Sequence, residues 1–255
     1  MKIALIQTSL TWEDTAANRA NFSQKINTIT EDVDLIVLPE MFTTGFTMNP
    51  AAVAETMDGQ TVAWMQQIAV NRGCVLTGSI VVEQGGKYYN RLLFALPTGQ
   101  IKTYDKRHLF SFAGEDRHYT AGTEKLIIEY KGWKICPLVC YDLRFPVFSR
   151  NTEGYDVLLY IANWPQVRTF AWDALLKARA IENLSYTVGV NRLGQDANGH
   201  NYVGHSQVLD PLGAYVLEPQ VNDGVFIVEL NKEALVQTRA KFAFLNDKDW
   251  FEITY

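Results

Sequence analysis

The segment Trp133-Lys134-Ile135-Cys136-Pro137-Leu138-Val139-Cys140 begins the part of the chain that indicates the fold class. Before its last cysteine the residues are mostly apolar at both parities, which is typical of a strand covered on both faces. A predicted helix at 143–153 follows, then a strand at 157–161, a helix at 169–182 and a strand at 186–190. This alternation predicts βα units of an α/β protein.

The N-terminal part of the chain has the same alternation. Apolar runs predict strands at 3–6, 35–38 and 75–82. Between them, apolar residues recur at near-helical spacing over 14–31 and 61–72, which predicts two helices. The βα pattern therefore extends over both halves of the sequence.

Short turns indicate that antiparallel hairpins are mixed with these units. Gln84-Gly85-Gly86, Pro97-Thr98-Gly99 and Lys131-Gly132 each separate two apolar runs and have the composition of tight turns. The other predicted strands are 88–95, 101–104, 126–130, 205–209, 214–217 and 225–229. Because no linker rich in Pro, Gly or Ser divides the chain, we predict one domain, residues 1–255, built as an α/β sandwich with mixed sheets.

The composition limits the partners and the compartment. Of the 255 residues 47% are hydrophobic, enough for a large core, and the net charge of -5 gives no excess of positive charge for phosphates. No apolar run is long enough to span a bilayer, and the apolar start ends at Gln7, too early for an export signal. Cys74, Cys136 and Cys140 lack the spacing of a disulfide framework or a zinc site. We expect a cytoplasmic protein without nucleic-acid or membrane partners.

Residues 240–255 form an aromatic tail without a regular period. The tail contains Phe242, Phe244, Trp250 and Phe251. So many aromatic side chains need cover, either from this domain or from a second subunit. We expect the tail to pack at a subunit interface.

Three reactive side chains are predicted at the carboxyl ends of strands, where ligands collect in layered α/β proteins. Glu40, Lys106 and Cys140 each follow an apolar run directly or within two residues. Cys140 also precedes a predicted helix, whose dipole would favour a thiolate. Each residue has an ordinary interpretation as well: Cys140 as a small buried hydrophobe, Glu40 as an exposed loop residue and Lys106 as part of a solvated turn.

Taken together, the sequences around these three residues resemble the nitrilase superfamily. The motifs are Leu38-Pro39-Glu40-Met41-Phe42, Tyr104-Asp105-Lys106-Arg107-His108-Leu109 and Cys140-Tyr141-Asp142-Leu143-Arg144-Phe145-Pro146. Further similar segments are 3–7, 162–165, 177–183, 204–206 and 210–213. The resemblance covers nearly the whole chain, and it implies a four-layer αββα sandwich that forms a homodimer or a higher homo-oligomer and requires no metal or organic cofactor.

The resemblance assigns a catalytic triad to Glu40, Lys106 and Cys140. Cys140 would attack the carbon of a small amide, Glu40 would act alternately as base and acid, and Lys106 would hold the oxyanion. The backbone N–H of Tyr141 would be the second oxyanion donor. Glu115 resembles the second glutamate that many members place near the lysine to orient substrate or water, and its alternative is a surface acidic loop.

Within the superfamily, the chain is most similar to the omega-amidase branch, which releases ammonia from 2-oxoglutaramate and related 2-oxo acid amides through a thioester on the cysteine. An arginine could bind the carboxylate of such a substrate bidentately. Arg168 and Arg192 are the candidates by position, and each could instead form a surface salt bridge. Phe110 and Trp164 could line the pocket or belong to the core.

Two other kinds of function remain open from the sequence. The same triad could serve an N-carbamoyl amino acid, an aliphatic amide or a nitrile. From another class, Cys140 could pair with His108, His118 or His205 in a cysteine-histidine hydrolase, or the fold could act as a noncatalytic binding module. The alternative substrates differ in the products released. The other two classes are distinguished by which side chains surround Cys140.

Overall fold

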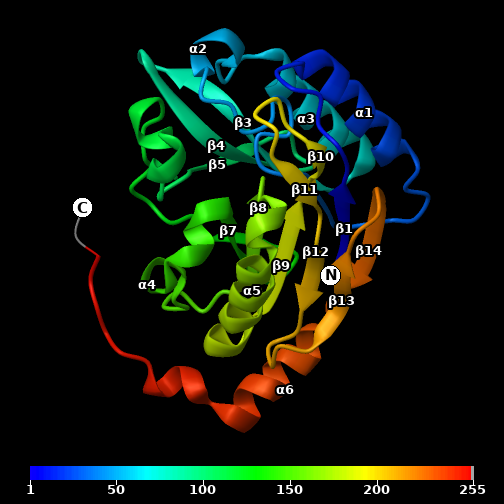
Figure 1. Cartoon of the computed structure of the whole chain (residues 1–255). Helices are drawn as coiled ribbons and strands as arrows, with labels where there is room; N and C mark the ends of the chain where they lie inside the picture. The colour runs from blue at the N-terminus through cyan, green and yellow to red at the C-terminus, as the bar shows by residue number, and fades with distance from the viewer. Residues whose placement is uncertain (254–255) are drawn as a thin grey trace.

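Two six-stranded sheets form the centre of the computed structural model, which describes residues 1–253 (Figure 1). The first sheet has the order β14 (Gly224–Glu229), β1 (Lys2–Gln7), β2 (Leu35–Val37), β3 (Val75–Gln84), β4 (Lys87–Ala95), β5 (Ile101–Asp105). The second has the order β13 (Tyr215–Gln220), β12 (Ser206–Leu209), β9 (Tyr186–Asn191), β8 (Val157–Ala162), β7 (Trp133–Val139), β6 (Ile128–Tyr130).

Both sheets are mixed. Strands β1, β2 and β3 are parallel to one another, as are β7, β8 and β9, while the outer strands pair antiparallel. The parallel strands are the buried apolar runs. Among the antiparallel strands, β4, β5 and β6 come from the predicted hairpins, whereas β14 pairs with β1 and β12 pairs with β9 across long stretches of chain. The prediction of mixed sheets is therefore confirmed.

Alternate residues of the first sheet face opposite sides. Leu5 and Val37 belong to the main core cluster, which also contains the apolar side chains of the second sheet. Ala4 and Ile36 belong to another cluster, which they share with helices α1 (Thr15–Asn27) and α3 (Gln60–Arg72). Because strand side chains alternate with period two, one face packs on helices and the other on the second sheet.

Helix α5 (Thr169–Asn183) covers the second sheet and completes the four layers of an αββα sandwich (Figure 1). Trp172 and Leu176 of this helix are fully buried. They approach β9 at Gly189, where an added Cβ would lie 2.5 Å from Leu176 and 2.8 Å from Trp172. A glycine is required there because any side chain would push the helix away from the sheet.

The predicted helix at 143–153 is wrong in extent. The structure has a short 3-10 helix, η3 (Cys140–Arg144), followed by the single turn α4 (Pro146–Ser149). Pro146 separates the two, since the residue before a proline is pushed out of the helical region, and Phe145 has φ -115° and ψ 86°. The helical pattern was present in the sequence, but the proline divided it.

Two helices and one hairpin were not predicted. They are the single turn α2 (Pro50–Val53), helix α6 (Lys232–Phe242), and the hairpin of β10 (Leu193–Gln195) with β11 (Asn201–Val203). Residues 240–242, expected to lie in an irregular tail, complete α6.

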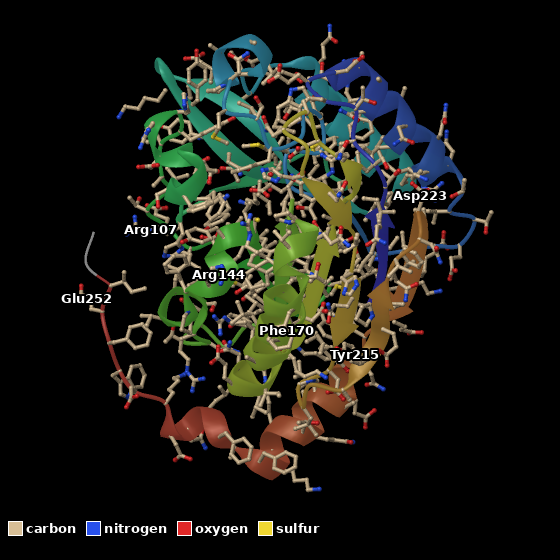
Figure 2. The ribbon with its side chains drawn as sticks, viewed as in Figure 1. Arg107, Arg144, Phe170, Tyr215, Asp223 and Glu252 are labelled. Carbon is tan, nitrogen blue, oxygen red and sulfur yellow. The ribbon has the colours of Figure 1, made fainter. Side chains whose placement is uncertain are left out.

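Beyond α6 the tail continues through η5 (Phe244–Asp247) and runs back along the molecule to Glu252 (Figures 1 and 2). Ile253 packs against the core, whereas Trp250 is 87% exposed. The predicted tail positions 254 and 255 lie outside the described residues. Within 1–253 no helix has both the length and the apolar character needed to cross a membrane.

Candidate active site

The three predicted reactive residues come together where β2, β5 and β7 end. Glu40 lies just after β2, Lys106 directly after β5 and Cys140 directly after β7. Cys140 has φ 46° and Met41, beside Glu40, has φ 42°. Such a conformation costs of order 1–3 kcal/mol for a residue with a side chain. Both turns therefore hold backbone strain that the surrounding sheets must stabilise.

A buried cluster of three charges forms the floor of the site. The Lys106 ammonium donates to Oε1 of Glu40 at 2.9 Å and to the two oxygens of Glu115 at 3.0 and 2.9 Å. The three side chains are all fully buried. The main-chain N–H of Phe110 also donates to Glu115, at 2.6 Å. The second glutamate is thus part of the cluster and does not lie in a surface acidic loop.

The two carboxylates keep Lys106 positively charged. Burial by itself would lower the pKa of Lys106, but Glu115 and Glu40 outweigh burial and raise the pKa. The pKa of Glu115 is also raised, because burial and the Glu40 charge together outweigh the attraction of Lys106. Since one cation faces two carboxylates, the cluster tends to take up a proton as the pH falls.

Cys140 begins η3 beside this cluster, and its sulfur lies 4.0 Å from the main-chain oxygen of Asn163. Burial raises the pKa of the Cys140 thiol, and Glu40 raises it further by its charge and by a hydrogen bond, against the opposing charge of Lys106. The sequence-based expectation of a helix dipole that favours a thiolate is therefore not supported. The resting group is a thiol, so a base must accept its proton as it reacts.

Asn163, which follows β8, fixes the Glu40 side chain and main chain. Its N–H donates to Glu40 Oε2 at 2.8 Å, and its side-chain amide donates to the Glu40 carbonyl at 2.6 Å. Strand β8 is in the second sheet and β2 is in the first. The pair therefore joins the two sheets at the point where Glu40 meets Cys140.

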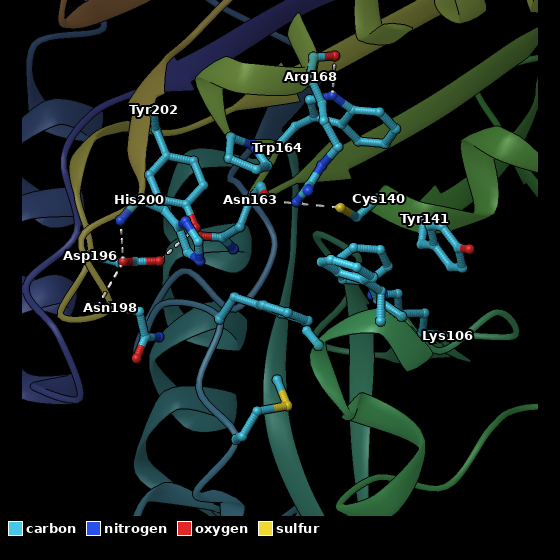
Figure 3. Close-up of a pocket in the computed structure, with 16 residues that line it drawn as sticks. Lys106, Cys140, Tyr141, Asn163, Trp164, Arg168, Asp196, Asn198, His200 and Tyr202 are labelled. Atoms are coloured by element: carbon cyan, nitrogen blue, oxygen red, sulfur yellow. Dashed lines mark hydrogen bonds between the residues drawn. The ribbon is translucent and has the colours of Figure 1, made fainter.

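A pocket of about 340 Å³ opens above Cys140 (Figure 3). Its wall is largely aromatic and apolar, with a few polar groups. Besides Cys140, the lining residues outside the β10–β11 hairpin are Phe46, Met48, Lys106, Phe110, Phe112, Ala113, Tyr141, Asn163, Trp164, Pro165 and Arg168. The loop of the β10–β11 hairpin and the start of β11 supply Asp196, Asn198, His200 and Tyr202.

Three of the four predicted substrate-binding residues line this pocket. The Arg168 guanidinium lies 5.0 Å from the centre of the Phe110 ring, and the Trp164 indole N–H donates to the Arg168 carbonyl at 2.8 Å. Among residues 1–253 no carboxylate forms an ion pair with Arg168. Its charge is therefore available to an anionic ligand.

Arg192 does not line the pocket, which corrects its prediction as a substrate-binding residue. Its side chain is fully buried and donates to the carbonyls of Leu193, Leu10 and Gln195 at 3.0, 3.3 and 3.3 Å. The guanidinium lies 4.6 Å from the centre of the Tyr202 ring. Arg192 thus stabilises the β10–β11 hairpin, and Tyr202 of that hairpin lines the pocket.

The three histidines considered as partners of Cys140 lie outside the pocket lining. His108 Nδ1 is 2.7 Å from Asp142, and the ring stacks on Phe145 with centroids 3.8 Å apart. His205 Nδ1 is 2.9 Å from Asp173. The charged groups that affect the thiol are Glu40, Lys106 and Glu115, so the structure does not support the cysteine-histidine hydrolase. The histidine of the pocket is His200, which was not predicted.

Some residues of the site could not be recognised from sequence alone. Asn90 of β4 donates to both Glu40 and Glu115, and its only signal is a polar side chain within an apolar strand. Asp142 had a signal, because it lies two residues after Cys140 in the motif, but its partners in the lysine loop could not be inferred. Phe46 and the β10–β11 hairpin carried no recognisable signal.

Comparisons with known proteins agree with this geometry. The family model for carbon-nitrogen hydrolases matches residues 2–240. The omega-amidase YafV of Escherichia coli K12 is 45% identical over 254 residues, covering 99% of this chain and 98% of that protein. The 2-oxoglutaramate amidase of Bacillus subtilis is 33% identical over 219 residues, 84% of each chain.

Among solved structures, XC1258 of Xanthomonas campestris, described as a CN-hydrolase superfamily protein with an arsenic adduct in the active site, superimposes with a TM-score of 0.97. It is 43% identical and covers 100% of this chain and 99% of its own. With the family match across most of the sequence and a relative at 45% identity over its length, this chain belongs to the carbon-nitrogen hydrolase family.

Proposed function

We propose that this protein hydrolyses the terminal amide of a short 2-oxo acid amide such as 2-oxoglutaramate and releases ammonia. It is an omega-amidase-type carbon-nitrogen hydrolase, and its relatives include omega-amidases and 2-oxoglutaramate amidases. The observation that carries the substrate proposal is the Arg168 guanidinium, which forms no ion pair within residues 1–253 and lies in the same pocket as Cys140. Figure 3 shows the Arg168 side chain reaching into that pocket.

The first half of the reaction forms a tetrahedral adduct on Cys140, which becomes a thioester when ammonia leaves. The Cys140 sulfur attacks the amide carbon, and its proton passes to Glu40. The Lys106 ammonium has three N–H donors, of which Glu40 takes one and Glu115 holds another between its two oxygens. The third donor is left for the oxyanion, together with the N–H of Tyr141, which has no partner within η3 because it lies in the first turn.

The second half releases the products. Glu40 returns the proton to the departing nitrogen, the carbon-nitrogen bond breaks and ammonia leaves. Water then attacks the thioester carbon, giving one proton to Glu40, and the carbon-sulfur bond breaks to free the carboxylic acid. The proton on Glu40 returns to the Cys140 sulfur. Glu115 keeps Lys106 charged and oriented through both steps.

The size and charge of the pocket favour a small anionic amide. A volume of about 340 Å³ is near the lower end of the range for small-molecule sites. A guanidinium binds a carboxylate through two parallel hydrogen bonds, which fixes the far end of the substrate. The Asp196 carboxylate in the same pocket already accepts from the main chain of Asn198 and His200 and from the Tyr202 hydroxyl. Arg168 is then the group left to meet the substrate's charge.

The test measures ammonia released from 2-oxoglutaramate by the wild type, Cys140→Ala, Arg168→Ala and Arg168→Lys. Cys140→Ala should be inactive. Arg168→Ala should raise KM for 2-oxoglutaramate by about 10–100-fold, in line with the loss of a charged hydrogen-bonded pair, and Arg168→Lys should recover part of that loss. A neutral aliphatic amide of similar length is the control, because its hydrolysis should not change in either variant.

The outcomes separate the substrate from the mechanism. If the wild type releases no ammonia from 2-oxoglutaramate, the substrate proposal fails, and N-carbamoyl amino acids, aliphatic amides and nitriles become the panel. Carbon dioxide released with ammonia would identify a carbamoyl substrate. If Cys140→Ala were as active as the wild type, the nucleophile assignment would fail as well.

We also propose that the protein acts in the cytoplasm as a homo-oligomer. The three cysteines are all free, which fits a reducing compartment. Exposed aromatic side chains remain on the tail and on α5, where Figure 2 shows Phe170 on the outer side of the helix. A second subunit would cover them.

A further inference from the structure

Asn90 contacts three of the four residues in the catalytic cluster. It is fully buried on β4. Its amide nitrogen donates to Glu40 Oε1 at 2.8 Å and lies within 3.4 Å of Glu115 Oε1. Its main-chain carbonyl accepts the main-chain N–H of Lys106 at 3.0 Å. A single neutral residue therefore joins the two carboxylates and the lysine.

The chemistry of its neighbours fixes the orientation of the Asn90 amide. Glu40 and Glu115 each present an oxygen to the same end of the side chain. Because an ionised carboxylate only accepts hydrogen bonds, that end must be the NH₂ group, which has two donors for the two oxygens. The side-chain oxygen of Asn90 then faces away from the carboxylates and has no hydrogen-bond partner among residues 1–253. Exchanging the oxygen and the NH₂ group by rotating the amide would place the oxygen against two carboxylates, which cannot donate to it.

The arrangement matters because the cluster has one cation for two carboxylates. The charged or titratable groups that act on it are Lys106, Cys140 and Tyr119, in addition to the two glutamates themselves. Hydrogen bonds to the ionised form of a carboxylate favour that form. A neutral donor shared by both glutamates therefore favours ionisation without a second buried cation.

We propose that Asn90 is a positioning residue that holds Glu40 turned so that Oε1 faces Lys106 and the other oxygen, which accepts from the N–H of Asn163, is left for Cys140. Asn90 touches neither the substrate nor the reacting sulfur and acts through Glu40. The inference rests on the proposed role of Glu40 as the base. It adds a residue to the reaction that neither the motifs nor the comparisons with relatives identify.

The competing interpretation is that Asn90 only fills a buried polar position of β4. Two substitutions separate the alternatives. Asn90→Ala removes the donor and the volume, whereas Asn90→Asp keeps the volume and replaces the donor with a third carboxyl group. A packing role predicts that Asn90→Asp resembles the wild type more than Asn90→Ala does. A donor role predicts the reverse at neutral pH.

The experiment measures kcat and KM of the wild type and both variants on 2-oxoglutaramate, or on the best amide found, as a function of pH. In Asn90→Ala we expect kcat to fall by about 10–100-fold with little change in KM. The acidic limb of kcat/KM should move to higher pH by about one unit, the size of one lost hydrogen bond to a charged group. Asn90→Asp should lose more kcat than Asn90→Ala at neutral pH.

The matched control is Asn151→Ala. Asn151 is also fully buried and donates to the carbonyls of Tyr155 and Asn183 at 2.9 and 3.1 Å, outside the pocket lining. Its loss should lower the melting temperature without moving the acidic limb. Circular dichroism reports whether each variant is folded, and Asn90→Ser replaces Asn90→Ala if the latter is not.

A wild-type acidic limb in the folded Asn90 variants, or full activity of Asn90→Asp, would overturn the inference. Glu40→Gln shows which proposal has failed. If Glu40→Gln is inactive while the Asn90 variants keep the wild-type pH profile, only the role of Asn90 is wrong. If Glu40→Gln stays active, the base assignment falls and the inference falls with it.

Discussion

Asp142 and His108 are joined twice, because the main-chain N–H and ring Nδ1 of His108 lie 3.0 and 2.7 Å from the same oxygen, Oδ1 of Asp142. The other oxygen of Asp142 accepts from the Tyr104 hydroxyl at 2.8 Å and from the N–H of Val139 at 2.9 Å. One buried carboxylate therefore connects the turn that carries Cys140 to the loop that carries Lys106. The separation of Cys140 and Lys106 depends on it.

Replacing Asp142 with Asn should impair both activity and stability. An amide has one oxygen, so its NH₂ group would face N–H or O–H donors on one side. We expect the free energy of unfolding to fall by roughly 1–3 kcal/mol for the groups left unpaired, and kcat to fall about 10–100-fold as the site loses its alignment. Steady-state kinetics and urea denaturation measure the two effects.

The control for this prediction is His108→Phe, which keeps the main-chain bond and the stacking on Phe145 and loses only the ring contact. Its kcat should change by less than that of Asp142→Asn. A normal kcat in a destabilised Asp142→Asn protein would show that the carboxylate stabilises the fold without setting the geometry of the site.

Replacing Lys106 with Met should make stability depend on pH more steeply than in the wild type. The folded-state pKa of Lys106 is raised above the ordinary lysine value of 10.5, so the contribution of Lys106 is present below that value and is lost only at higher pH. Without the lysine, the already raised pKa of Glu115 rises further. A raised carboxyl pKa gives a contribution that is present at low pH and lost as the pH rises through the folded-state pKa.

The free energy of unfolding of Lys106→Met should therefore decrease as the pH rises above the ordinary carboxyl pKa, by about 1.4 kcal/mol for each unit of pKa shift. At pH 7 the loss relative to the wild type should be roughly 3–5 kcal/mol, as for other buried charges without a partner. Denaturation at several pH values measures this. If the free energy of unfolding depended on pH in the same way in both proteins, the carboxylates would be stabilised in Lys106→Met by water or by another positive charge.

Iodoacetamide should label the native protein at one cysteine. Cys74 and Cys136 are buried, and burial raises the pKa of Cys74 to about 11 and that of Cys136 further. Cys140 lines the pocket and lies beside the Glu40 carboxylate. Mass spectrometry should find a single adduct on Cys140, and all three only after denaturation.

The Cys140 thiol also has a raised pKa, so its labelling should depend on Glu40 as proton acceptor. Glu40→Gln should slow the modification at neutral pH, while the rate at Cys74 in denaturant stays the same. Equal rates in the two native proteins would show that the thiol ionises without help from Glu40.

The elements that could be predicted are those whose pattern has one physical cause. Strand β7 was predicted with the observed bounds, because an apolar run between a Gly turn and a polar motif fits only a buried strand. Helix α3 was also predicted, with its start placed one residue too late. Helix α6 was not recognised because only Leu235 is buried on it, so its apolar stripe is too narrow to show.

The same distinction applies to the site. Glu40, Lys106 and Cys140 could be found because each lies within three residues of the end of a strand and belongs to a motif. Asn90 and Arg192 could not be interpreted, because their roles depend on groups that the folded sheets bring close. Asn90 is 50 positions from Glu40, and Arg192 contacts a carbonyl 182 positions away. No local pattern contains that information.

The aromatic tail should hold two subunits together. Trp250 is 87% exposed and Phe251 42% exposed in the single chain, and exposed apolar side chains of this size mark association surfaces. We expect light scattering to give at least twice the chain mass of 28.9 kDa for the wild type. The double variant Trp250→Ala with Phe251→Ala should shift toward the single-chain mass on dilution. Phe112→Ala is the control, because Phe112 is equally exposed but lines the pocket.

Two outcomes would contradict this prediction. An oligomer whose mass is unchanged in the double variant would place the subunit interface elsewhere. A wild type that is a single chain at all concentrations would show that the tail aromatics remain uncovered in solution.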